Sequence, residues 1–187
     1  MVAPGAALEC RDVDGARWAD LEKLFEGRGG PAYCWCMVWR PMAAAARRGG
    51  GKEARKRALR RLVDAGVPIG VLGYRDGEPV AWCSVAPRES YRAMGGPGDF
   101  ADDAGTVWSI GCFFVRRDHR GGGLSERLLA AAVERARKAG ARVVEAYPVA
   151  PDSPSYRFMG LTTVFERAGF AHLGMVGKRR HLMRLDI

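Results

Sequence analysis

The hydrophobic and polar residues of this chain repeat with two periods, which predict strands alternating with helices. Apolar runs of strand length occupy residues 8–13, 69–74, 79–85, 108–115 and 143–146. Helical repeats occupy residues 18–25, 52–65 and 124–133. Two closing strands are expected within residues 171–187, around Gly177 and Lys178. This order predicts an α/β fold with a mixed sheet, in one domain over residues 1–187.

Two of these segments carry clear local signals. Asp76 and Gly77 stand between apolar runs, which is typical of a tight β-hairpin turn. The repeat in residues 52–65 places apolar residues on one helix face and cations on the other. The inward positions are Ala54, Ala58, Leu59, Leu62 and Val63.

A chain of 187 residues has room for a sizeable hydrophobic core. No apolar run reaches the ~20 residues that a membrane-spanning helix needs. The first residues lack the charged start and hydrophobic centre of a secretory signal. We therefore expect a cytoplasmic protein that spans no membrane.

The five cysteines are an odd number, which disfavours a disulfide framework and fits a reducing compartment. Cys34 and Cys36 form one close pair, but the chain has no second pair and its three histidines are scattered. Structural zinc sites usually need such a second pair. Free buried or half-buried thiols are the favoured interpretation, and no metal is expected.

The segment between the strand at 108–115 and the helix at 124–133 carries the strongest chemical signal. It is basic and contains three successive glycines, Gly121 to Gly123, directly before the helix. Such a loop offers backbone N–H groups where the helix dipole favours negative charge, which suits a phosphate or pyrophosphate. Its glycine spacing fits neither a Walker loop nor a dinucleotide fingerprint.

The spacing from Arg120 to Ser125 instead resembles the acyl-coenzyme A loop of the GNAT N-acetyltransferases, with Ser125 where Gly or Ala is usual. Residues 165–170, Phe-Glu-Arg-Ala-Gly-Phe, are similar to the Tyr-Glu-Lys-x-Gly-Phe motif of that family. The Cys-Trp-Cys-Met-x-Trp-Arg segment at 34–40 resembles a bacterial GNAT subgroup whose substrates are mostly unassigned. The resemblance covers nearly the whole chain.

The resemblance implies a mainly antiparallel twisted sheet flanked by helices, with two central strands that splay apart around acetyl-coenzyme A. The implied contacts to the pantetheine arm are backbone groups of Phe113, Phe114 and Val115. The implied contacts to the pyrophosphate are Arg120, Gly121, Gly122, Gly123, Leu124 and Ser125. The tyrosine that many members use as general acid aligns with Phe165, and a family asparagine aligns with Phe158. The leaving thiolate therefore needs another proton donor, or the reaction proceeds by positioning and carbonyl polarisation without one.

An acetyl transfer to an amine needs a neutral amine, and a carboxylate is the usual group that takes its proton. Glu145 is the first candidate, because it precedes the Tyr147-Pro148 turn near the expected opening of the strands. An equally weighted alternative is that Glu145 only pairs with an arginine. Tyr156 and Tyr147 are candidates for the proton donor, and Glu89 and Asp152 are reserve carboxylates.

The acceptor is expected to be the amine of a small molecule. Acidic residues at 99–103, with Glu89 and Asp152, suggest an aminoglycoside-like cation, as in antibiotic resistance or self-protection. Trp35, Trp39, Trp82 and Trp108 are candidate walls of its site. The alternative for the carboxylates is a solvated surface.

Three other functions stay open. The net charge of +9 and the basic helix at 52–65 suit an acidic partner such as aminoacyl-tRNA, although no nucleic-acid motif is present. Acetylation of a protein is a second alternative, and a non-catalytic acyl-coenzyme A sensor is a third. The sequence does not decide between a monomer and a homodimer.

Overall fold

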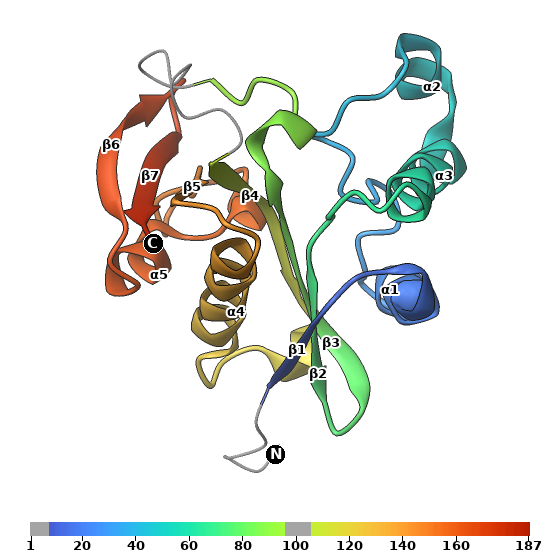
Figure 1. The fold of residues 1–187 in the computed structure, drawn as a ribbon, viewed down its shortest axis with the longest axis horizontal. Coiled ribbons are helices and arrows are strands. Elements are labelled where there is room, and N and C mark those ends of the chain that lie inside the picture. The colour runs from blue at the N-terminus through green and yellow to red at the C-terminus, as the bar shows by residue number, and fades with distance from the viewer. Residues whose placement is uncertain (1–7, 96–105) are drawn as a thin grey trace.

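A seven-stranded sheet crosses the centre of the computed structural model, in which residues 8–95 and 106–187 are described (Figure 1). The strands are β1 (Glu9–Asp12), β2 (Val71–Arg75), β3 (Glu78–Pro87), β4 (Val107–Val115), β5 (Val143–Ala146), β6 (Ala171–Val176) and β7 (Arg180–Asp186). Their order across the sheet is β1-β2-β3-β4-β5-β7-β6. Every neighbouring pair is antiparallel except β4 and β5, which are parallel. The predicted mixed, mainly antiparallel sheet is confirmed.

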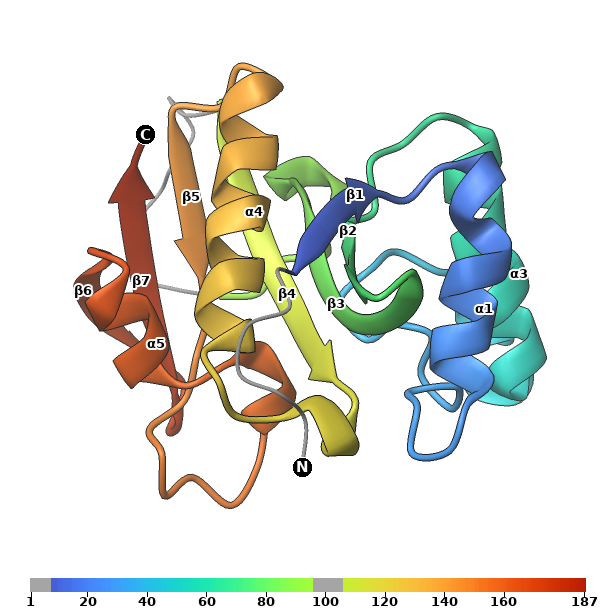
Figure 2. The same ribbon diagram turned by 90° about the horizontal axis from the view of Figure 1, so that it is seen from below.

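Helices cover both faces of this sheet. They are α1 (Trp18–Glu26), α2 (Ala44–Gly49), α3 (Gly51–Asp64), α4 (Leu124–Lys138) and α5 (Thr162–Arg167). Short 3-10 turns occupy Gly15–Arg17, Arg88–Ser90, Arg117–His119 and Arg157–Met159. Helix α4 lies on one face, and α1 and α3 lie on the other (Figures 1 and 2).

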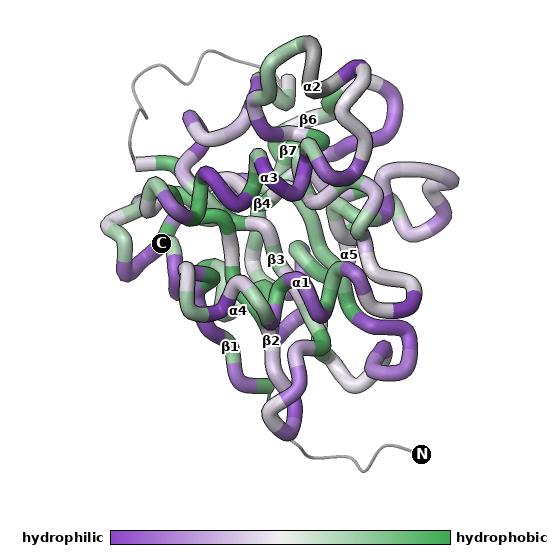
Figure 3. Tube along the Cα trace, turned by 90° about the vertical axis from the view of Figure 1, so that its right-hand side faces the viewer, coloured by the Kyte–Doolittle hydropathy of each residue, from purple (hydrophilic) through white to green (hydrophobic). Residues whose placement is uncertain are grey.

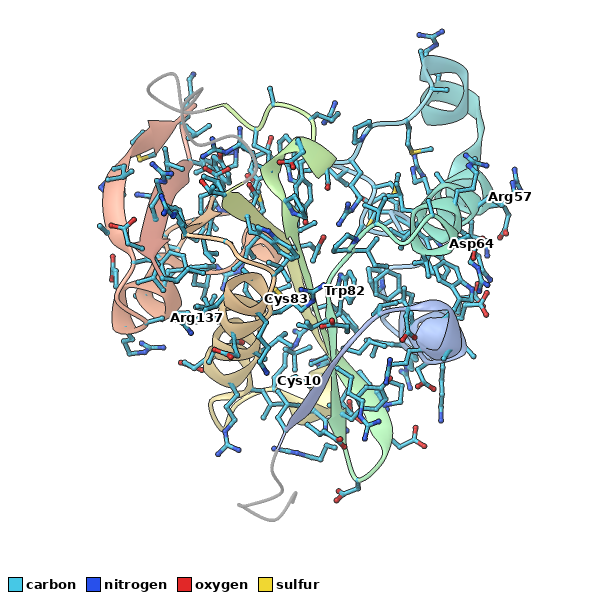
Figure 4. All side chains as sticks on the ribbon, viewed as in Figure 1. Cys10, Arg57, Asp64, Trp82, Cys83 and Arg137 are labelled. Carbon is cyan, nitrogen blue, oxygen red and sulfur yellow. The ribbon has the colours of Figure 1, made fainter. Side chains whose placement is uncertain are left out.

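Alternation along the strands divides most apolar residues between two cores, and a smaller third cluster includes Ala86 at the end of β3. Trp82 and Cys83 are neighbours in β3 whose side chains leave the sheet on opposite sides (Figure 4). Trp82 belongs to the core under α1 and α3, and Cys83 to the core under α4. Hydrophilic positions are frequent on α3 and on the outer turns, whereas the central strands are more hydrophobic (Figure 3). The two cores explain why β3 is buried along nearly its whole length.

All predicted strands and helices are present, with small differences in length. Four of the five predicted inward residues of α3 are buried, and Leu62 is half-buried. Helix α4 continues to Lys138, beyond the predicted end at residue 133. Charged residues 134–138 hide its apolar period, although Ala136 in that stretch is fully buried. Helix α2 was not predicted, because six residues from Ala44 to Gly49 provide too few turns for a period.

No helix in the described ranges combines the length and apolar character that crossing a membrane requires.

Two glycines allow a test of how tightly β2 and β3 pack. A Cβ atom at Gly70, whose φ is +150°, would lie 2.2 Å from the Cys83 carbonyl oxygen. Gly77, in the hairpin turn, has φ +77° and open space around it. We expect Gly70→Ala to lower the free energy of unfolding by about 2–4 kcal/mol in urea titrations. Gly77→Ala should cost about 1 kcal/mol, from backbone strain alone. Equal losses would contradict the close approach at Gly70.

Candidate active site

The central feature of the site is the place where β4 and β5 separate. Their parallel pairing begins at Val107 and Val143 and stops at Ile110 and Ala146. Strand β5 ends there, whereas β4 continues to Val115 and diverges from it (Figure 2). The edge of β4 beyond Ile110 is therefore left without a β5 partner, and such an edge can accept an extended ligand as a substitute strand.

A β-bulge lies at the same place. Ser84 pairs with Cys112 and Val85 pairs with Ile110, so Gly111 is the additional residue of β4. The Tyr91 ring lies against Gly111, since a Cβ atom there would be 3.1 Å from the Tyr91 Cε1 atom. After the bulge, Phe113 faces the α4 core and Cys112 faces the α1 core. The bulge thus directs side chains from the β4 edge to both faces of the sheet.

One cavity reaches this edge from the α4 face. This α4-side cavity has a volume of about 380 Å³. Its lining includes Phe113, Phe114 and Val115 of β4, Arg120 and Ser125 of the glycine loop, and Phe158 and Phe165.

A second cavity reaches the edge from the α1 face. This α1-side cavity has a volume of about 150 Å³. It is lined by Pro31, Tyr33, Cys34, Cys36, Val38, Trp39, Ser84, Tyr91, Gly111, Cys112, Phe113, Phe114 and Phe158. The two cavities share Phe113, Phe114 and Phe158. Two ligands entering from opposite faces would therefore meet at β4.

The glycine loop has the conformation that an anion site needs. Gly121, Gly122 and Gly123 have φ values of +88°, +61° and +75°, which disfavour any residue with a Cβ atom. Helix α4 starts at Leu124 without a side-chain cap, so its first N–H groups lack intrahelical acceptors. Arg120 Nε donates to the Val115 carbonyl oxygen at 3.0 Å, which places this cation beside the loop. The sequence-predicted phosphate-binding residues are therefore brought together at one end of the α4-side cavity.

Phe165 fills the position where the family motif usually has tyrosine. It is fully buried, and its ring lies 5.7 Å from that of Phe113 and 5.1 Å from that of Phe170. It lines the α4-side cavity with carbon atoms alone. Phe158 lies at the junction of both cavities. These two residues shape the site but supply no proton.

Glu145 is fully buried in an ion pair. Arg88 donates from Nη2 to Glu145 Oε2 at 2.6 Å and from Nε to Oε1 at 3.0 Å. Ser109 Oγ and Tyr147 Oη donate to the same Oε1 at 2.6 and 3.0 Å. Glu145 lines neither cavity. This arrangement is the one expected if Glu145 only pairs with an arginine. A proton-transfer role for Glu145 stays a prediction.

The two predicted proton donors differ in their surroundings. Tyr147 is buried, and burial followed by the charge of Glu145 raises the pKa of its hydroxyl. Tyr156 is 40% exposed, with its ring 6.1 Å from that of Phe158. Neither residue lines the α4-side cavity or the α1-side cavity.

The predicted substrate residues do not gather at one site. Trp35 and Trp82 are core residues with 1% and 0% exposure, and Trp82 Nε1 donates to Cys36 Sγ at 3.0 Å. They lie behind the α1-side cavity instead of on its surface, because both rings pack against Phe25. Glu89 and Asp152 are exposed and line neither cavity. The acidic residues at 99–103 fall outside the described residues.

A polar cluster that was not predicted lies at the α1-side cavity. The hydroxyls of Tyr91 and Ser84 lie 2.9 Å apart, and Arg40 Nη2 donates to Tyr91 Oη at 3.3 Å. Arg40 is 1% exposed, and its Nε and Nη1 atoms have no hydrogen-bond partner among the described residues. Burial raises the pKa of Tyr91 to about 12, although Arg40 and Ser84 oppose this effect. Ser84 and Tyr91 are seven positions apart, whereas Arg40 is 51 positions from Tyr91, so the sequence did not indicate that the three side chains meet.

The cysteines are free thiols, as predicted: Cys36, Cys83 and Cys112 are buried, and Cys10 and Cys34 are half-buried. Cys34, Cys36 and Cys112 line the α1-side cavity. Hydrogen bonding with Cys112, together with burial, holds the pKa of Cys36 well above its ordinary value. A raised pKa keeps the Cys36 thiol protonated, which disfavours a nucleophilic role for this residue.

The family model described as Acetyltransferase (GNAT) family matches residues 43–161, which include β2 to β5, α4 and the glycine loop. The chain belongs to the GNAT acetyltransferase family. None of the curated proteins compared with this GNAT chain is similar enough in sequence to count as a match.

Solved structures show the same fold. AAC(6')-Ib, in complex with ribostamycin and coenzyme A, is 17% identical with a TM-score of 0.61, over 96% of this chain and 93% of that one. The ribosomal-protein-alanine N-acetyltransferase from Brucella melitensis is 19% identical with a TM-score of 0.57, over 96% and 100%. The acetyltransferase yncA from Salmonella typhimurium, with acetyl-CoA, is 17% identical with a TM-score of 0.56, over 96% and 94%. At these identities the likeness establishes the GNAT fold alone.

The ion pair of Glu145 yields a stability test. We expect Glu145→Gln to lower the free energy of unfolding by about 2–3 kcal/mol, because it removes the charge that the half-buried Arg88 guanidinium faces. Glu166→Gln, at an exposed carboxylate, should change it by less than about 0.5 kcal/mol. Urea titrations of both variants measure the difference. Equal stabilities would show that the Arg88 pair does not stabilise the fold.

Proposed function

We propose that this protein transfers an acetyl group from acetyl-coenzyme A to the primary amine of a small molecule. One observation carries the proposal: two cavities on opposite faces of the sheet open on the same unpaired edge of β4. A donor in one cavity and an acceptor in the other would place their reacting atoms next to Gly111. Membership of the GNAT family supports acetyl transfer as the reaction.

We assign the donor to the α4-side cavity. The pantetheine arm would bond to backbone groups of Phe113, Phe114 and Val115 along the unpaired edge. The pyrophosphate would accept hydrogen bonds from the backbone N–H groups of the loop from Gly121 to Ser125. The α4 dipole adds positive potential there, and Arg120 would add a full positive charge.

We assign the acceptor to the α1-side cavity. Part of its wall comes from residues 34–40, the segment that resembles a bacterial GNAT subgroup. An ammonium group that enters this apolar space loses hydration, which lowers its pKa and favours the neutral amine. The amine nitrogen then attacks the thioester carbonyl carbon. A C–N bond forms as the C–S bond breaks, the nitrogen loses one proton and the sulfur gains one.

Tyr91 is our first choice for the donor of the proton to sulfur. Its ring lies against Gly111, at the point where β4 and β5 separate, and its hydroxyl is held by Ser84 and Arg40. Glu145, Tyr147 and Tyr156 remain candidates. The first two would have to break their mutual hydrogen bond, and Tyr156 would have to turn toward the cavity. Proximity to the bulge therefore favours Tyr91.

The finer identity of the acceptor needs a direct test. An aminoglycoside-like substrate was expected from carboxylates, of which Glu89 and Asp152 lie away from the cavities and the others fall outside the described residues. Proteins and aminoacyl-tRNA are competing acceptors, and an acyl-coenzyme A sensor would have no acceptor. The cytoplasmic location likewise stays a prediction.

Release of free coenzyme A thiol tests the function. We expect release from acetyl-coenzyme A with at least one amine in a panel of amino acids, aromatic amines, polyamines, aminoglycosides and peptides. Gly123→Glu should weaken acetyl-coenzyme A binding at least about 100-fold, because it places a carboxylate at the pyrophosphate site. Gly140→Glu is the matched control, since Gly140 has a similar φ of +85° at the other end of α4. Tight cofactor binding without release would instead favour a sensor or a macromolecular acceptor.

Tyr91→Phe tests the proton donor. The variant keeps the ring against Gly111, so we expect an unchanged KM for acetyl-coenzyme A and a kcat about 100-fold lower. Because the pKa of Tyr91 is raised to about 12, the wild-type donor stays protonated through pH 10, and its contribution is lost only as pH rises through that pKa. Tyr74→Phe is the control. Tyr74 lies in β2, its hydroxyl donates to Asp20 of α1, and it lines neither cavity. A kcat equal to that of the control would exclude Tyr91 as the donor.

A further inference from the structure

The walls of the α1-side cavity indicate which kind of acceptor it can hold. Its lining consists of aromatic rings, thiols, small residues and the hydroxyls of Tyr33, Ser84 and Tyr91, with no charged side chain among the described lining residues. The Trp39 Nε1 atom is buried without a hydrogen-bond partner in the described structure. The cavity therefore suits the apolar body of a ligand with few polar atoms.

Two cations contact the same tryptophan from outside the cavity. The Arg180 guanidinium carbon lies 4.6 Å from the centre of the Trp39 ring, and that of Arg92 lies 5.4 Å from it. The Arg92 backbone N–H also donates to the Trp39 carbonyl oxygen at 2.8 Å, which fixes the two residues together. Trp39 thus separates an apolar interior from a rim that carries two positive charges.

The rim cations are not neutralised within residues 8–95 and 106–187. Arg180 Nη1 donates to the Met94 carbonyl oxygen at 2.8 Å, and its guanidinium also faces the rings of Tyr147 and Tyr156. Burial lowers the pKa of Arg180, and the described groups that oppose this effect are tyrosines, not carboxylates. Arg92 is exposed and forms no ion pair with a described carboxylate. Both guanidinium groups therefore keep donors for an anion.

We propose that the acceptor is an amphoteric amine, in which an apolar body separates the reacting amine from a carboxylate or similar anion bound by Arg92 and Arg180. The inference rests on the proposed function and specifies its substrate. The amine end would reach Gly111 and Tyr91, and the anion would remain at the Trp39 rim. A polycation would have to pass two like charges to enter, so the rim selects against it.

Matched ligands test this charge requirement. 4-(Aminomethyl)benzoate and 4-(aminomethyl)benzamide have the same body and amine, and differ in the anion. We expect kcat/KM for the benzoate to exceed that for the benzamide at least about 10-fold, as for a charge-assisted pair. Kanamycin and spermidine should be poor acceptors. The preference should weaken as salt rises, because the rim is open to solvent.

Variants at the rim identify the groups responsible. In Arg180→Gln and Arg92→Gln we expect KM for the benzoate to rise about 10-fold, with kcat and the KM for acetyl-coenzyme A within about 2-fold. The benzamide should be unaffected. Arg180→Lys, which keeps the charge, should restore part of the preference. Arg179→Gln is the control, because Arg179 bonds Ser155 Oγ at 3.0 Å on the exposed turn.

Binding measured by calorimetry separates this inference from the function on which it rests. Acetyl-coenzyme A binding confirms that each variant is folded. Turnover without an anion preference, or with a preference for kanamycin or spermidine, would overturn the amphoteric acceptor and leave the transferase standing. Benzoate binding that depends on Arg180, without release of coenzyme A, would support the anion site and overturn the transferase. If the benzoate is neither bound nor turned over, the anion site is overturned.

Discussion

The separation of β4 from β5 is the constraint on which the rest of the site depends. The two strands pair over four residues, and β5 then reaches Tyr147 and Pro148. Proline has no N–H group to continue a ladder. Val149 instead donates to the Gly160 carbonyl oxygen and accepts from the N–H group of Thr162, the first residue of α5. Strand β4 continues without it, and the unpaired edge becomes the place that both cavities reach.

The buried ion pair stands directly before this separation. Ser109 and Glu145 are register partners in the last stretch of β4–β5 pairing, and Arg88 joins them from the turn that ends β3. Three strands are thus tied together where the sheet is about to open. Such an ion pair is costly to bury and requires a specific geometry. It therefore suits a position where the register of β4 against β5 has to be fixed. This gives Glu145 a clear role in the fold, whatever its part in proton transfer.

Charge is distributed differently on the two sides of the opening. On the α4 side, the helix N-terminus and Arg120 face the cavity itself, which suits the phosphates of a large anionic donor. On the α1 side, cations are confined to the rim around Trp39, and the interior is apolar. An apolar interior favours the neutral amine that attack requires, whereas the rim can hold a charge away from the reaction.

The sequence by itself determined the strands, the helices and the glycine loop, because hydrophobic period and backbone conformation are local properties. It also indicated a loop suited to an anion, since Arg120 to Ser125 are contiguous. Only the tertiary structure revealed the α1-side cavity and the polar cluster beside it. Arg40, Ser84 and Tyr91 come from three separate segments, and Trp39 meets Arg180 across 141 positions of the chain. The tertiary structure also placed Trp35 and Trp82 in the core and Glu145 in an ion pair, because burial and partners depend on contacts between distant segments.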